Sequence, residues 1–225
     1  MFTDAKKEII NTGIKLDRYG LIALSGGNIS SRMPTGEILV SPSGMIYEDM
    51  DPDDIVVMDL NGSIIEGNRK PSSDTEAILY IFQKRPDING IIHTHQPYAT
   101  AISLIQDELE VNLTTLGNAC GGPVKVTPIS AAGSVEMGID TVNHIGSSYA
   151  VILAHHGVMT IGKDVKQALY AAVYLEECAK GYLAARAVGP TRSLTPAQIQ
   201  QSIDVFKYYG QGTDSIPKEL TQRLT

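Results

Sequence analysis

"GIIHTHQPYATAIS", residues 90–103, joins an apolar run, two histidines one residue apart and a proline that can open a helix. The run predicts a buried strand over 90–95, and a helix is expected from Pro97 onward. Side chains at i and i+2 of a strand point to the same face, about 6.5–7 Å apart along the chain. On a helix the same positions would be separated by about 200°. The strand therefore predicts that His93 and His95 can reach one ion.

A second apolar segment, "YAVILAHHGVMTIG" (149–162), predicts a strand, a break at Gly157 and another strand. His155 and His156 lie at the end of the first of these strands, and spacing alone does not choose between them. Four of the five histidines thus lie at the ends of two apolar strands. This favours a metal site over incidental surface histidines. Three protein nitrogens, each about 2.0–2.1 Å from the ion, plus an open position are the pattern of a catalytic zinc.

Helix and strand signals alternate along the rest of the chain. Helices are expected over 4–18, 73–84, 134–145, 164–187 and from Thr195-Pro196 onward, and strands over 36–41, 54–60 and 63–67. Asn61-Gly62 predicts a hairpin with a type I′ turn, because both central residues of that turn need a positive φ. Ser73 and Glu76 match the S-x-x-E capping box, which assigns Glu76 to a helix start. This pattern predicts an α/β or α+β protein with a mostly antiparallel or mixed sheet.

Composition narrows the function class. The 225 residues carry 25 acids and 18 Lys and Arg, a formal net charge of −7. That balance argues against nonspecific binding of nucleic acid or anionic membranes, which needs clustered basic residues. No apolar run approaches the roughly 20 residues of a membrane span, and the N-terminus lacks signal-peptide features, so we expect a cytoplasmic protein. Cys120 and Cys178 form no Cys-x-x-Cys pair, and we expect both to be packing residues of a reduced protein.

Three short segments are rich in small polar residues: "SGGNIS" (25–30), "SPSG" (41–44) and "PSSD" (71–74). Their hydroxyls and glycine-flanked amides suit a phosphate dianion, and Ser72-Ser73 also open a helix whose positive end favours an anion. Each segment taken alone is equally an ordinary turn. The three together make a phosphate site a hypothesis that only their arrangement in space can support.

Two further residues are candidates for proton transfer. Asp74 lies in the first turn of the helix expected from Ser73, where it is either a helix-dipole acid or a carboxylate at the mouth of a metal and phosphate site. Tyr209, in "FKYYG", is a candidate proton donor near the C-terminus. Neither residue carries a function by itself.

Taken in order, these segments resemble the class II aldolase/adducin family. The matching elements are "SGGNIS", "SPSGMIY", "EG…KPSSD", "HTH", "AHHGVMTIG" and "FKYYGQG", which together span residues 25–212. The resemblance implies one α/β domain over residues 1–225, with a C-terminal tail from about 195. It also implies a central, mostly antiparallel sheet flanked by helices, and a C4 homotetramer with active sites between subunits.

The resemblance further implies a set of site residues. Zinc would be held by His93, His95 and the histidine directly before the glycine, His156, with His155 as a neighbour. Asp74 would be the catalytic acid/base, and Tyr209 would act in a neighbouring subunit's site. The substrate phosphate would lie among Ser25, Gly26, Gly27, Asn28, Ser43, Gly44, Ser72 and Ser73.

Departures from the family pattern bear on the reaction. Aldolase members acting on L-fuculose 1-phosphate carry Glu where this chain has Asp74, and a tyrosine roughly where it has Thr115. The 4-epimerase members acting on L-ribulose 5-phosphate have an acid/base Asp where an ungapped count gives Asn118, and an amide cannot exchange a proton in that role. The short stretch between Pro128 and "AHHG" is aldolase-like, whereas "PSSD" and "YYGQ" are epimerase-like.

The resemblance thus implies a zinc enzyme, and we predict an aldolase. It would reversibly cleave a ketose 1-phosphate of the L-fuculose type to dihydroxyacetone phosphate and a short aldehyde. The alternatives are the 4-epimerase, a related zinc sugar-phosphate lyase or dehydratase, and a non-catalytic binding module of the adducin type. In such a module the metal histidines are expected to be lost.

Overall fold

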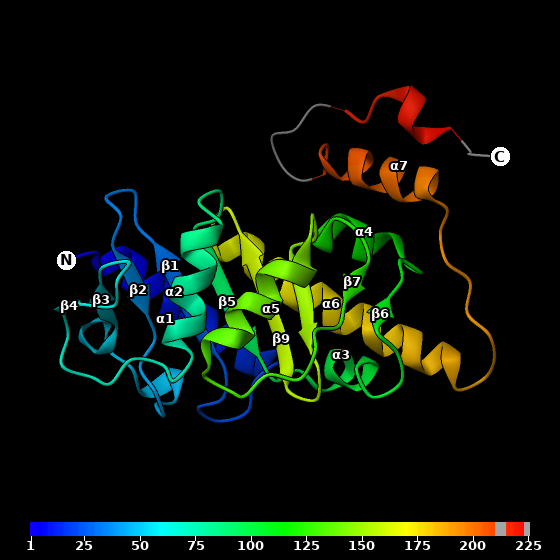
Figure 1. Cartoon of the computed structure of the whole chain (residues 1–225). Coiled ribbons are helices and arrows are strands. Elements are labelled where there is room, and N and C mark those ends of the chain that lie inside the picture. Colours follow the sequence, from blue (N-terminus) through cyan, green and yellow to red (C-terminus); the bar gives the residue numbers. More distant parts are fainter. Residues whose placement is uncertain (210–214, 223–225) are drawn as a thin grey trace.

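The computed structural model of the protein describes residues 1–209 and 215–222. Its centre is a seven-stranded antiparallel sheet with the order β4-β3-β2-β1-β5-β9-β8 (Figure 1). The strands are β1 (Asn28–Arg32), β2 (Ile38–Val40), β3 (Val56–Met58), β4 (Ile64–Glu66), β5 (Gly90–Thr94), β8 (Ala150–Leu153) and β9 (Gly157–Gly162). Two short strands, β6 (Glu108–Leu109) and β7 (Val124–Lys125), pair separately.

Helices cover both faces of this sheet (Figure 1). They are α1 (Thr3–Arg18), α2 (Thr75–Lys84), α3 (Pro97–Ile102), α4 (Thr114–Cys120), α5 (Val135–Ile145), α6 (Val165–Arg186) and α7 (Pro196–Phe206). Three short 3-10 turns lie at Tyr47–Asp49, Pro52–Asp54 and Lys218–Thr221. Helices α2 and α5 pack on one face, and α1 and α6 pack on the other.

The strands supply both of these packed layers by alternation. Ile91 of β5 packs toward α2 and α5, whereas the next residue, Ile92, packs toward α1 and α6. The same alternation holds in β3, where Val56 and Val57 go to opposite layers. Strands of a sheet that is covered on both faces have continuous apolar sequences, and this explains why the sequence indicates these strands clearly. The expected α/β fold with a central antiparallel sheet flanked by helices is confirmed.

The hairpin between β3 and β4 is present, but the type I′ turn is wrong. Gly62 has a φ of +87°, whereas Asn61 is not among the described residues with a positive φ. Instead, the carboxylate of Asp59 accepts the amides of Asn61 and Ser63 at 2.8 and 2.9 Å. This arrangement fits a turn closed by Gly62 donating to the Asp59 carbonyl, with one left-handed glycine.

The capping box assigned to Ser73 and Glu76 is also wrong. Helix α2 begins at Thr75, so Asp74 occupies the N-cap position and Ser73 lies outside the helix. The segment before it is held by Ser72, whose amide donates to the Ser41 carbonyl at 3.1 Å, so the chain turns into α2 later than the sequence pattern predicts. The Asp74 carboxylate makes no capping bond. It is therefore available for other contacts.

The sequence pattern missed α4, a short helix that supports the C-terminal tail. Helix α7 packs on α4, and a Cβ on Gly117 would lie 3.2 Å from the Ser202 hydroxyl. Residues 210–212, the end of the "FKYYGQG" motif, lie outside the described residues. Within the described part of the chain, no helix combines the length and apolarity that crossing a membrane requires.

Candidate metal centre

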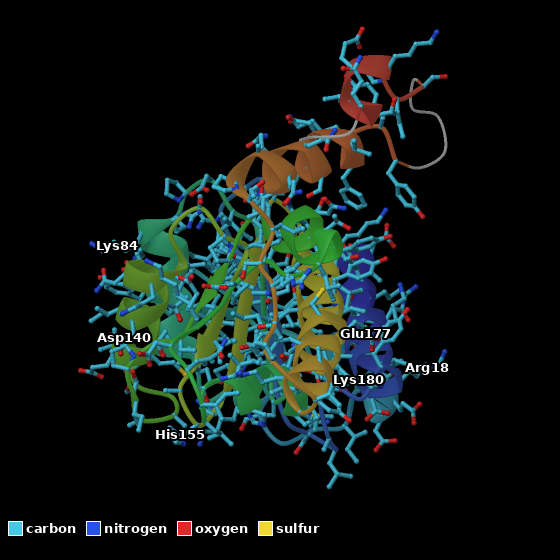
Figure 2. All side chains as sticks on the ribbon, turned by 90° about the vertical axis from the view of Figure 1, so that its right-hand side faces the viewer. Arg18, Lys84, Asp140, His155, Glu177 and Lys180 are labelled. Atoms are coloured by element: carbon cyan, nitrogen blue, oxygen red, sulfur yellow. The ribbon has the colours of Figure 1, made fainter. Side chains whose placement is uncertain are left out.

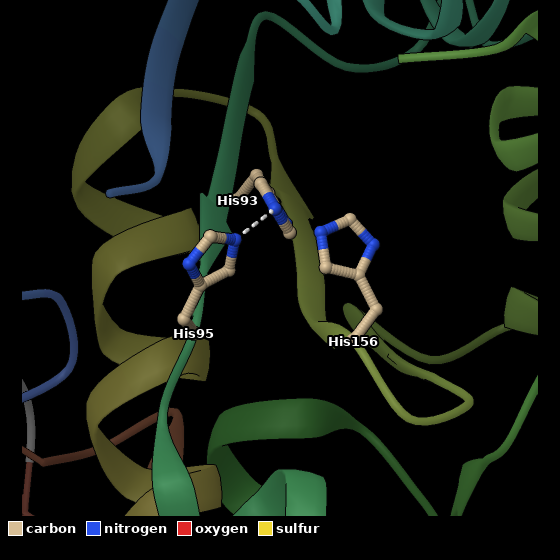
Figure 3. A group of neighbouring side chains, drawn as sticks. All are labelled: His93, His95 and His156. Carbon is tan, nitrogen blue, oxygen red and sulfur yellow. Dashed lines mark hydrogen bonds between the residues drawn. The ribbon is translucent and has the colours of Figure 1, made fainter. Parts of the chain in front are cut away.

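Three histidines meet at the end of the sheet where β5 stops and β9 begins (Figure 3). His93 is on β5, His95 follows that strand, and His156 directly precedes β9. The Nε2 atoms of His93 and His95 are 3.0 Å apart, and one ligand atom from each histidine lies within 4.8 Å of the others. The rings of His93 and His156 have centroids 4.8 Å apart. This geometry fits three nitrogen ligands of one ion.

His93 has the tautomer that metal binding through Nε2 requires. Its Nδ1 lies 2.9 Å from the carbonyl oxygen of Val158. A carbonyl can only accept, so the neutral ring carries its proton on Nδ1 and leaves a lone pair on Nε2. Burial lowers the pKa of His93 to about 4, with the nearby Asp74 carboxylate opposing that shift. Burial also lowers the pKa of His95. Neutral imidazoles with an oriented second nitrogen are typical of metal-ligating histidines.

Two glycines allow the backbones around these rings to come close. Gly27 has a φ of +76°, and a Cβ there would lie 2.6 Å from the His93 carbonyl oxygen. A Cβ on Gly157 would lie 2.2 Å from the Thr94 carbonyl oxygen. A larger residue at either position would push the strands apart. The glycines in "SGGN" and "AHHG" therefore serve the approach of β1 and β9 to β5.

His155 lies outside the histidine cluster. It is exposed, has a φ of +56°, and its amide donates to the hydroxyl of Ser103 at 3.0 Å. The left-handed conformation at His155 reverses the chain, so that His156 is the residue whose ring meets His93 and His95. The structure therefore brings His156 to the other two histidines, the alternative that spacing alone could not select.

Asp74 lies beside this cluster, although 19 positions separate it from His93 in the numbering. One of its carboxylate oxygens is 3.8 Å from Nε2 of His93. The same oxygen accepts the side-chain amide of Asn28 at 2.7 Å. Both Asp74 and Asn28 are buried. A carboxylate held this close to the metal-facing nitrogen is placed to move a proton at a bound substrate.

Asn28 brings a free acceptor to the same place. It pairs with His93 across β1 and β5. Its amide nitrogen is engaged by Asp74, but its amide oxygen is buried and has no hydrogen-bond partner within the described chain. Leaving a buried polar oxygen unpaired costs about 1–3 kcal/mol. A substrate hydroxyl that donates to this oxygen would recover that energy.

The three small-residue segments converge next to this group. Segments 41–43 and 70–72 run side by side, because Ser43 donates its amide to the Lys70 carbonyl and Ser72 donates to the Ser41 carbonyl. The bond between Asn28 and Asp74 joins segment 25–28 to the other two. Ser25, Ser43, Gly44 and Ser73 are exposed, Gly26 and Gly27 are half-buried, and Ser72 is buried. The segments thus form one polar rim on the side of the cluster where Asp74 and Asn28 lie beside His93.

Other candidates lie elsewhere in the same chain. Tyr209 follows α7, is exposed, and stacks on Phe206 with ring centroids 5.4 Å apart. Figure 2 shows α7 at the end of the molecule opposite the loop that carries His155. Thr115 and Asn118 are on α4, beneath α7. With its nitrogen turned toward α7, the Asn118 amide donates to the Ser202 carbonyl at 2.8 Å.

Sequence reasoning missed two residues that contact the chain around the histidines. Gln96 follows His95 and is fully buried, and Ser103 accepts the amide of His155. A glutamine placed directly between "HTH" and a helix-opening proline was a weak signal for such a contact. No local pattern indicated Ser103, because its partner is 52 positions away in the sequence.

Comparison with known proteins points to one family. The model of the "Class II Aldolase and Adducin N-terminal domain" matches residues 7–183. The chain is 33% identical over 207 residues to a 5-deoxy-D-ribulose 1-phosphate aldolase of Bacillus thuringiensis, covering 92% of this chain and 97% of that protein. It is 32% identical over 197 residues to an L-ribulose-5-phosphate 4-epimerase of Salmonella paratyphi C, covering 82% and 86%.

A solved structure agrees with these sequence relatives. It is that of an L-fuculose 1-phosphate aldolase, which is 31% identical, has a TM-score of 0.87, and matches over 92% of this chain and 97% of its own. The chain belongs to the class II aldolase and adducin family, whose aldolases are metal-dependent.

Proposed function

We propose that this protein is a zinc-dependent aldolase that reversibly cleaves a ketose 1-phosphate to dihydroxyacetone phosphate and a short aldehyde. The observation that carries the proposal is the cluster of His93, His95 and His156 with the Asp74 carboxylate 3.8 Å from His93. Two similar proteins with 92% coverage of this chain are named as aldolases of ketose 1-phosphates. We keep the L-fuculose type of substrate as our expectation.

The side chains divide the work as follows. A zinc ion held by His93, His95 and His156 would supply Lewis acidity to the carbonyl of the ketose. When the bond between C3 and C4 breaks, the C4 hydroxyl loses a proton to become the aldehyde, and C3 gains a proton. We assign the proton at C3 to Asp74, which Asn28 holds in place.

Phosphate binding and the second proton complete the assignment. The substrate phosphate would lie on the polar rim formed by Ser25, Gly26, Gly27, Asn28, Ser43, Gly44, Ser72 and Ser73. Amides and hydroxyls suit a dianion. In the condensation direction Asp74 would take the proton from C3, and Tyr209, in the site of a neighbouring subunit, would donate its proton to the aldehyde oxygen that becomes the C4 hydroxyl. Figure 2 shows α7, which Tyr209 follows, opposite the loop that carries His155.

L-Ribulose-5-phosphate 4-epimerase is the second candidate. It is favoured by the 32% identity to an enzyme of that name. An epimerase would retain the aldehyde, rotate it and add it back. Asn118, at the position expected for that enzyme's acid, instead has its amide against Ser202 of α7. This contact favours the aldolase.

Three further expectations belong to the proposal. We expect zinc as the metal, a C4 homotetramer with sites between subunits, and a cytoplasmic location. Both cysteines are free and buried, which fits a reducing compartment. The complete histidine cluster speaks against a binding module of the adducin type, in which these ligands would have no use.

The proposal is tested by metal analysis and by substrate choice. Purified protein should contain about one zinc per chain, lose activity with a chelator and regain it with zinc. Coupled detection of dihydroxyacetone phosphate should report cleavage of L-fuculose 1-phosphate or 5-deoxy-D-ribulose 1-phosphate. The His95→Ala variant should lose metal and activity. The control His144→Ala, at a histidine outside the cluster, should keep both.

Formation of D-xylulose 5-phosphate from L-ribulose 5-phosphate without cleavage would replace the aldolase by the epimerase. Protein without bound metal whose properties are unaffected by chelation would overturn the enzyme assignment. Retained metal and turnover in His95→Ala would disprove the ligand role of that residue.

A further inference from the structure

A buried carboxylate of α6 holds the start of α3. Glu176 is 5% exposed, and its two oxygens accept the main-chain amides of Tyr98 and Ala99 at 2.9 and 2.8 Å. These amides lie in the first turn of α3, where no helix carbonyl can accept them. Burial raises the pKa of Glu176, and the two amide bonds oppose that shift. The carboxylate thus replaces a side-chain N-cap, which α3 lacks.

The residues on both sides of His95 are tied to the same helix. Gln96 is fully buried, and its amide nitrogen donates to the Ala172 carbonyl of α6 at 3.1 Å. Its amide oxygen accepts the hydroxyl of Thr94 at 2.6 Å. Ala172 and Glu176 are one helical turn apart, so they present one continuous surface to the chain around His95.

The other end of α3 contacts the third histidine's loop. Ser103, the residue after α3, accepts the amide of His155 at 3.0 Å. His155 is in the left-handed conformation, and His156 is the next residue. Helix α3 therefore links the residue after His95 to the residue before His156, and it packs along α6 (Figure 1).

We propose that Glu176 is a positioning residue for the metal centre: by anchoring α3 on α6, it fixes the spacing between His95 and His156. This inference rests on the proposed metal site. Groups that orient ligands from outside the coordination shell commonly change metal affinity 10–100-fold when they are altered. Ser103 is the second contact through which α3 acts.

The test uses the Glu176→Gln variant of the full chain. Gln has nearly the same shape but only one acceptor oxygen, so one α3 amide loses its partner. Metal-free protein is titrated with Co²⁺, and its visible absorption is recorded. We expect about 10–100-fold weaker Co²⁺ binding and an altered absorption band, because ligand geometry determines both. Ser103→Ala, which frees the other end of α3, should shift affinity and spectrum in the same direction.

Asp164→Ala is the matched control. Asp164 caps the N-terminus of the same helix α6, accepting the Gln167 amide at 2.7 Å, without contacting α3 in that bond. The Asp164→Ala variant should have a lower melting temperature but unchanged Co²⁺ affinity and spectrum. If Glu176→Gln does not fold, the Co²⁺ titration of Ser103→Ala alone tests whether α3 positions the histidines.

Wild-type affinity and spectrum in Glu176→Gln, or in Ser103→Ala where the first does not fold, would overturn the positioning role. An equal loss of Co²⁺ affinity in Asp164→Ala would also overturn it, since the effect would then follow stability. If the wild-type protein itself bound neither Co²⁺ nor Zn²⁺, the proposed function would be wrong. If the wild-type protein bound Co²⁺ and the variant bound it equally well, only the positioning role of Glu176 would be wrong.

Discussion

The carboxylate of Asp74 does not cap the helix that it precedes and contacts the histidine site instead. Asp74 occupies the N-cap position of α2 but makes no capping bond, and its carboxylate turns instead to Asn28. That contact spans 46 positions in the sequence. It holds the carboxylate 3.8 Å from Nε2 of His93, which is consistent with the proposed role of Asp74 in proton transfer.

Asp74→Asn should therefore retain metal and lose turnover. The amide oxygen of the new residue can still accept from Asn28, and all three histidines remain, but an amide cannot carry a proton to and from substrate. We expect turnover to fall by about 10²–10⁴-fold, measured together with metal content. Asp87→Asn, at an exposed ion pair with Arg85, is the control and should change neither. Loss of metal in Asp74→Asn would show that Asp74 is chiefly a ligand.

At the scale of elements, the site depends on how closely α5 approaches α2. A Cβ on Gly138 of α5 would lie 2.7 Å from the carbonyl oxygen and 2.9 Å from the Cα of Ala77 in α2. The segments that lead into these two helices also approach each other, since a Cβ on Gly133 would lie 2.9 Å from the Ser73 carbonyl oxygen. Close packing of the two helices therefore supports the segment that carries Asp74.

Gly138→Ala should destabilise the protein, although alanine is the better helix former. The clash is with backbone, so the two helices must separate, at a cost of about 1–3 kcal/mol. Alanine regains only about 1 kcal/mol in helix propensity. Gly181→Ala in α6 is the matched control: its Cβ would meet only ordinary contact with Leu113 at 3.5 Å, so it should stabilise slightly. Urea unfolding checks both, and stabilisation by Gly138→Ala would contradict the close packing.

At the scale of the whole molecule, α7 and the loop that carries His155 lie at opposite ends. Helix α7 sits on α4, and Figure 2 shows it opposite the His155 loop. A catalytic Tyr209 would therefore have to serve another subunit. The proposed homotetramer would supply such a partner, and subunit mixing can test that arrangement directly.

Asp74→Asn and Tyr209→Phe should each be nearly inactive alone but regain activity when mixed. In a cyclic assembly, a site made of one subunit's Asp74 and its neighbour's Tyr209 is intact in about a quarter of positions at a 1:1 ratio. Co-expression followed by charge separation of the hybrids allows this fraction to be measured. If both residues act within one subunit, no hybrid contains an intact site, and activity stays at the level of the two variants.

The sequence determined what depends on local pattern. The continuous apolar runs of β3 and β5, the spacing of His93 and His95, and each family motif are encoded within a few neighbouring residues. These features were sufficient for the fold class and for a histidine-based metal site. They could not give the turn at Gly62 or the start of α2. Those details depend on hydrogen bonds to the Asp59 side chain and between Ser72 and Ser41, and helix and turn propensities of single residues do not include such bonds.

Only the tertiary structure decided which groups meet. The left-handed turn at His155 directs His156 into the cluster, and Asn28 brings Asp74 to His93. The anchor of α3 on Glu176 joins residues 78 positions apart. Such contacts arise from strand register and helix packing, which bring distant parts of the chain to one place. The sequence by itself therefore indicates the fold and the candidate histidines, and the packed molecule determines the distances between them.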